Sequence, residues 1–117
     1  MIALTRGDSD ARELMKAARS EGADIVVPPV VLTQTVRGGP RDATVHQVLR
    51  FAYHSFVGAR LASRAGELLG MTGLDDAADA QVMAEAMRVT PSVVLTSDPD
   101  DMRALAGGRR DIRIVAV

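Results

Sequence analysis

The chain contains no cysteine and no tryptophan, and its 117 residues include only three aromatic side chains, those of Phe51, Tyr53 and Phe56. The absence of cysteine excludes disulfide-stapled scaffolds, thiolate zinc sites and cysteine nucleophiles. No apolar run approaches the roughly 20 residues that a membrane helix needs, and the N-terminus lacks the basic-then-apolar order of a signal peptide. We therefore expect a cytoplasmic protein that has no membrane partner.

Lysine is nearly absent as well, since thirteen of the fourteen basic residues are arginine and Lys16 is the exception. The planar arginine fork suits phosphate recognition, although a G+C-rich genome accounts for the same bias equally well. The net charge of -1 hides an uneven distribution, because residues 75–101 hold seven acids against one base, Arg88. Clustered acids on an otherwise mildly basic chain are typical of a metal site that faces an anionic substrate. Solvated helix ends rich in aspartate are the alternative.

The hydrophobic content of 47% and the length fit one small α/β domain that spans residues 1–117. Apolar spacing predicts helices from Asp8 or Ser9 to about Glu21, and over residues 30–37, 42–50, 59–71, 76–88 and 99–106. Runs rich in β-branched residues predict strands at 23–28, 91–96 and 112–117, and a short strand within 51–57. Because helices and strands alternate with short links, we expect parallel pairing through right-handed crossovers.

Asp79 is the most informative residue of the acidic stretch. Within its predicted helix it shares a face with Val82, Met83 and Ala86, the side that should pack against the sheet. An unpaired carboxylate there needs a cation, hydrogen-bond donors or a cleft, because its desolvation costs several kcal/mol. Asp76 lies one turn earlier and points the same way, either as a second ligand or as the helix N-cap.

Asp98 follows the apolar strand 91–96 almost directly, at the carboxyl end where ligands collect in open α/β sheets. It also precedes Pro99, which makes it a candidate N-cap. Asp100 and Asp101 fall in the first helical turn, and we interpret both mainly as partners of the helix dipole. Asp79, Asp98 and Asp76 could together bind Mg²⁺ or Mn²⁺, which take carboxylate, water and phosphate oxygens. The implied chemistry is metal-assisted phosphodiester hydrolysis, and no P-loop sequence is present.

Two segments carry a resemblance to a known family: Asp-Ala-Gln-Val-Met-Ala-Glu-Ala at 79–86, and Val-Val-Leu-Thr-Ser-Asp-Pro-Asp-Asp-Met-Arg-Ala-Leu at 93–105. With the closing strand 112–117 they resemble the C-terminal half of a PIN-domain protein, most closely the VapC-type toxins of bacterial toxin–antitoxin operons. Segments 25–32, 37–39 and 64–70 fit the same template, so the similarity covers nearly the whole chain.

The resemblance implies a PIN-like three-layer sandwich with a mainly parallel sheet. It also implies a Mg²⁺- or Mn²⁺-dependent endoribonuclease that hydrolyses RNA, is silenced by a cognate antitoxin and commonly forms a homodimer. Asp79 and Asp98 match the third and fourth acids of the family site, as catalytic and metal-binding residues, and Asp76 is similar to an auxiliary acid. The family's second acid corresponds to Gln34, whose amide orients water or coordinates weakly but adds no charge.

The family's first acid, which ends a central first strand, has no counterpart in this chain. By the resemblance, the chain begins at the helix that follows this strand, so the PIN-like domain is N-terminally incomplete. Three explanations stay open: a start upstream of Met1, replacement of the strand by another segment or chain, and a degraded toxin gene.

Two other functions compete with the nuclease. The first is a catalytically inert PIN-like remnant that only binds an antitoxin. The second, a flavodoxin-like regulatory domain phosphorylated on aspartate, fits the α/β pattern but lacks an acidic pair after an early strand and a lysine after a late one.

Overall fold

The structure is a computed structural model, and it describes residues 58–116 without a break. Before them it describes residues 13, 16–17, 19–22, 25–27, 38–40, 43, 46 and 52–54. The elements in chain order are β1 (Ile25–Val27), β2 (Ala52–His54), α4 (Ala59–Thr72), α5 (Ala77–Arg88), β3 (Ser92–Thr96), α6 (Pro99–Ala106) and β4 (Ile112–Ala116). Each of them lies where the sequence predicts a helix or strand. The predicted helix at 30–37 lies outside the described residues, as do Asp8 and Ser9.

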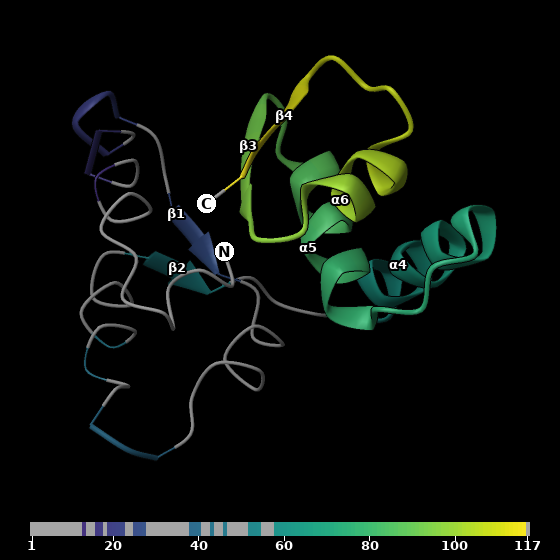
Figure 1. Cartoon of the computed structure of the whole chain (residues 1–117), viewed down its shortest axis with the longest axis horizontal. Coiled ribbons are helices and arrows are strands. Elements are labelled where there is room, and N and C mark those ends of the chain that lie inside the picture. The colour runs from purple at the N-terminus through teal and green to yellow at the C-terminus, as the bar shows by residue number, and fades with distance from the viewer. Residues whose placement is uncertain are drawn as a thin grey trace.

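Helices α4 and α6 both pack against α5. Helix α5 also contacts strand β3. In Figure 1 the helices lie together on one side of the β3–β4 pair. Helix α4 buries Leu61, Ala65 and Leu68, which recur at helical spacing on one face. Helix α5 is buried around most of its circumference, and Met83 at its centre is fully enclosed. The core of the described region therefore lies where α5 meets α4, α6 and the sheet.

Helix ends follow from the local sequence. Helix α4 stops at Gly73, whose backbone is left-handed (φ 74°) and whose N–H bonds to the carbonyl of Leu69 at 2.9 Å. A side chain at that φ is disfavoured, so glycine is the residue that fits. Helix α6 begins with Pro99, which needs no hydrogen bond at the first helical position.

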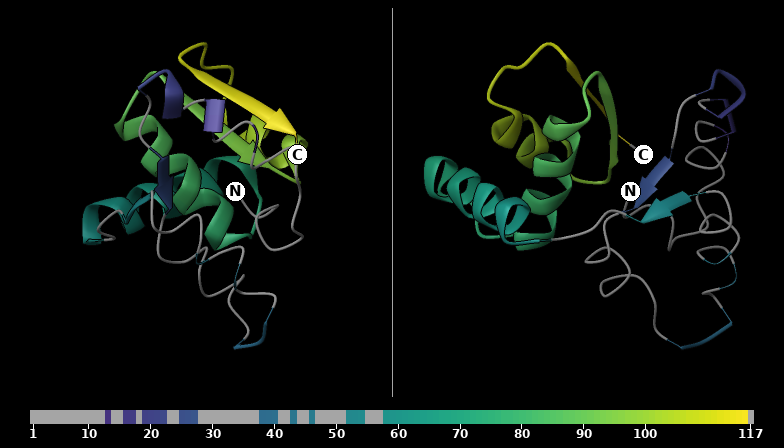
Figure 2. Two further views of the ribbon diagram at one scale, coloured as in Figure 1. Left: turned by 90° about the vertical axis from the view of Figure 1, so that its left-hand side faces the viewer. Right: turned by 180° about the vertical axis from the view of Figure 1, so that it is seen from behind.

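The described strands form two separate two-stranded parallel sheets, β1 with β2 and β3 with β4. In the second sheet Ser92 is paired with Ile112 and Thr96 with Ala116. Figure 2 shows both pairs from two further directions. The predicted α/β class and parallel pairing are confirmed, whereas the single sheet of a three-layer sandwich stays a prediction.

Within the β3–β4 sheet the two faces differ. Val94 and Thr96 are buried toward the helices, and Ile112 is buried on the same face. Val93 points to the opposite face and is 60% exposed. Among the described residues, no helix is both long enough and apolar enough to cross a bilayer.

Candidate metal centre

The first turn of α5 places two of the predicted acids. Asp76 is the N-cap residue, and its Oδ1 accepts a hydrogen bond from the backbone N–H of Asp79 at 3.0 Å. The capping interpretation of Asp76 is therefore confirmed. Capping fixes the start of α5 and orients Asp79 at its third position.

Asp79 is almost completely buried, with 2% of its surface exposed. Its Oδ1 finds no hydrogen-bond donor among the described residues. Burial, and to a smaller extent the nearby charges of Asp76, Asp98 and Asp101, together raise the pKa of Asp79 from 3.8 to about 6. A buried carboxylate oxygen without a donor is unfavourable when charged. A cation beside Asp79 would therefore stabilise the ionised form of its carboxylate.

The turn between β3 and α6 places Asp98. Thr96, the buried last residue of β3, accepts a hydrogen bond at its Oγ1 from the backbone N–H of Asp98 at 2.9 Å. Asp98 occupies the N-cap position of α6. The predicted N-cap position of Asp98 is therefore confirmed, but its side chain makes no capping bond. The carboxylate of Asp98 is left available for other contacts.

Asp101 lies one turn into α6, beside Asp98. The adjacent side chain of Asp98 raises the pKa of Asp101, with smaller contributions from desolvation and from the charges of Asp98, Asp100 and Asp76. Neighbouring carboxylates repel one another, and a proton or a cation between them relieves that repulsion.

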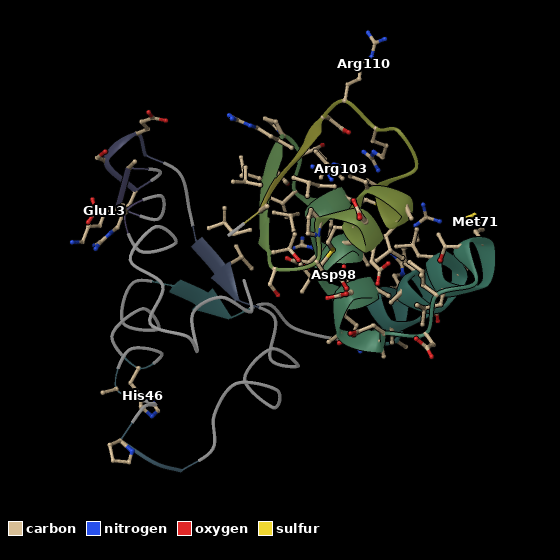
Figure 3. The ribbon with its side chains drawn as sticks, viewed as in Figure 1. Glu13, His46, Met71, Asp98, Arg103 and Arg110 are labelled. Carbon is tan, nitrogen blue, oxygen red and sulfur yellow. The ribbon has the colours of Figure 1, made fainter. Side chains whose placement is uncertain are left out.

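One ligand oxygen from each of Asp79, Asp98 and Asp101 lies within 4.8 Å of the other two. Three evenly spaced oxygens on one Mg²⁺ are at most about 3.6 Å from one another, because each metal–oxygen distance is about 2.1 Å. Around Ca²⁺ the same limit is about 4.5 Å. The three carboxylates therefore fit one divalent cation after their oxygens approach one another by up to about 1 Å. Figure 3 labels Asp98, which stands at the start of α6.

No protein-family model, curated protein or solved structure matches this chain. The site must therefore be judged by its own geometry. Surface acids often cluster without an ion, so the cluster alone is weak support for a metal. The buried and unpaired Oδ1 of Asp79 is the stronger observation, because it has no structural role among the described residues.

The structure brings Asp79 and Asp98 together, as the sequence predicted for these two residues. Asp76 caps α5 and is not one of the three converging acids, so its role as a metal ligand stays a prediction. Gln34 lies outside the described residues. Asp101, which the sequence assigns mainly to the helix dipole, also joins the cluster.

The sequence itself carries a signal for the position of Asp101. Asp98-Pro99-Asp100-Asp101 has the spacing of a capping box, in which the first and fourth residues meet at the start of a helix. Asp76 and Asp79 have the same spacing at the start of α5. The site thus lies where the N-termini of α5 and α6 meet, with Asp79 from the first helix and Asp98 and Asp101 from the second.

Proposed function

We propose that this chain is a Mg²⁺- or Mn²⁺-dependent endoribonuclease with a PIN-like fold, related to the toxins of toxin–antitoxin modules. The cation would be held by Asp79, Asp98 and Asp101. The observation that carries the proposal is the buried, unpaired Asp79 Oδ1 within 4.8 Å of ligand oxygens from two further carboxylates. The substrate class rests on the resemblance in segments 79–86 and 93–105.

A divalent cation held by Asp79, Asp98 and Asp101 would supply an activated water and would neutralise charge that develops on a phosphate. The protein's own contribution is to position the ligands. Thr96 orients the backbone of Asp98, and Asp76 orients that of Asp79. Three carboxylates around one cation leave coordination sites for water and for substrate phosphate, as hydrolysis requires.

The resemblance extends the proposal to partners. A cognate antitoxin would silence the site, and the chain would act as a homodimer. An inert module that binds the antitoxin without cutting RNA is the alternative outcome of the experiment below.

The test is RNA cleavage by the purified chain with Mg²⁺, with Mn²⁺ and with EDTA. We expect metal-dependent cutting that is lost in Asp79→Asn and in Asp98→Asn. The matched control is Asp100→Asn, which removes a charge from the same turn of α6. Asp100 is 94% exposed at its side chain and only pairs with Arg103 at 3.3 Å, so its loss should leave cleavage unchanged.

Calorimetric titration with Mn²⁺ complements the cleavage assay. Binding that disappears in Asp79→Asn, without cleavage by the parent, would favour the inert module. Equal cleavage by the parent and by both site variants would show that a contaminating nuclease is responsible and would refute the proposal.

A further inference from the structure

Four arginines fall within residues 103–113, from α6 to the start of β4. They are Arg103 on α6, Arg109 and Arg110 in the loop that follows, and Arg113 on β4. Asp111 is the only acid in residues 103–113, so this segment has a formal charge of +3. Strands β3 and β4 are parallel, and Asp98 follows the carboxyl end of β3. The loop before β4 therefore lies at the opposite, amino-terminal end of the two strands.

Two of these arginines are already engaged. Arg109 donates to both carboxylate oxygens of Asp111, at 3.0 and 2.6 Å, which lowers the pKa of Asp111. Arg103 reaches Asp100 at 3.3 Å. Arg110 and Arg113 are exposed and form no ion pair with any residue that the structure describes. In Figure 3 Arg110 points away from the ribbon, far from Asp98.

Arg113 lies along the sheet between Arg110 and the end of the strands that carries Asp98. It is paired across the sheet with Val93, and both side chains are exposed on the face that points away from the helices. The five residues of β4 span on the order of 15 Å. Arg110, Arg113 and then Asp98 thus follow one another along the sheet, within the length of a few nucleotides.

We infer that Arg110 and Arg113 form a binding surface for the phosphate backbone of single-stranded RNA, which extends from the acidic site along the exposed face of β3 and β4. The inference rests on the proposed function, since it names where the substrate strand lies beyond the cleavage site. Exposed arginines spaced along a strand direction are suited to successive phosphates. Val93 adds apolar surface for contact with a base.

An acidic protein partner fits the same surface less well. Stable protein interfaces need buried apolar or aromatic anchors. Residues 107–111, Gly-Gly-Arg-Arg-Asp, contain no such anchor. On this face of the described sheet, Val93 is the one large apolar side chain that is more than half exposed. A polyphosphate needs only spaced positive charges.

The experiment measures binding of a fluorescein-labelled 12-nucleotide single-stranded RNA by anisotropy, with EDTA present so that cleavage does not interfere. The variant Arg110→Gln/Arg113→Gln is compared with the parent between 50 and 200 mM salt. We expect about tenfold weaker binding at low salt and a salt slope smaller by about 1.4, because each lost phosphate contact on single strands removes about 0.7. The control Arg60→Gln/Arg64→Gln removes the same charge from α4 and should bind like the parent.

Absence of RNA binding by the parent, unchanged binding by the Arg110/Arg113 variant, or an equal loss in both variants would each overturn the inference. Tight binding of a 12-residue poly-glutamate peptide, weakened by the same variant, would assign the surface to an acidic protein instead. Failure of the proposed function gives a different result. RNA would then bind through Arg110 and Arg113 in EDTA, while the parent would fail to cut it in Mg²⁺.

Discussion

The Asp79→Asn substitution removes the buried charge of α5 while it nearly preserves the shape of the side chain. In the native protein, desolvation and the charges of Asp76, Asp98 and Asp101 raise the pKa of Asp79 from 3.8 to about 6. The protonated form is therefore favoured by folding. The native state gains nothing from this group's charge, and ionisation of Asp79 opposes folding.

The size of the effect follows from the linkage between protonation and folding. Below pH 4 the carboxyl group is protonated in the folded and the unfolded chain, so it contributes no penalty. As the pH rises from 4 through the folded-state pKa of about 6, the unfolded chain ionises first and the folded state loses stability. A difference of about two pKa units corresponds to about 3 kcal/mol at pH 7.5. Asparagine carries no charge, so the variant avoids this loss.

Urea unfolding at pH 4.5 and at pH 7.5, in EDTA, measures the effect directly. We expect Asp79→Asn to be within about 1 kcal/mol of the parent at pH 4.5 and more stable by about 2–3 kcal/mol at pH 7.5. The control is Asp75→Asn, which removes an exposed charge four residues earlier and should show no such gain.

Addition of Mn²⁺ at pH 7.5 should shrink the advantage of Asp79→Asn, since a bound cation stabilises the parent alone. A variant that is less stable than the parent at pH 7.5, or a difference independent of pH, would refute the electrostatic account of Asp79. It would mean that a donor satisfies this carboxylate in solution.

Four further predictions concern the metal site and helix α4. Mn²⁺ at 100 times its dissociation constant should stabilise the parent by about 2.7 kcal/mol, and a thermal-shift assay should show little of this in Asp98→Asn. Thr96→Val removes the acceptor of the Asp98 N–H, so we expect a loss of about 1 kcal/mol in urea unfolding and weaker Mn²⁺ binding by calorimetry, while Thr96→Ser keeps both. Gly73→Ala places a side chain at φ 74° and should destabilise by about 1 kcal/mol. Gly70→Ala lies in the interior of α4 with open space around the new methyl group and should stabilise by about 0.5–1 kcal/mol in the same measurement.

The local elements could be predicted because their signals are short-range. Apolar spacing gave α4 and α5 nearly to the residue, and Gly73 and Pro99 marked a helix end and a helix start. Strands β3 and β4 followed from runs of β-branched residues, and their parallel pairing from the intervening helix α6. The division of the described strands into two separate sheets was not predicted, because sheet order depends on contacts between distant segments.

The amino-acid sequence by itself determined which carboxylates start α5 and α6, since capping and helix spacing act within a few residues. Only the tertiary structure decided that these two starts meet, which brings Asp79 to Asp98 and Asp101, and that Asp79 is enclosed without a donor among the described residues. The reason is physical. Burial and repulsion between charges depend on distances set by the packing of α5 against β3 and α6, and no local pattern in the sequence encodes those distances.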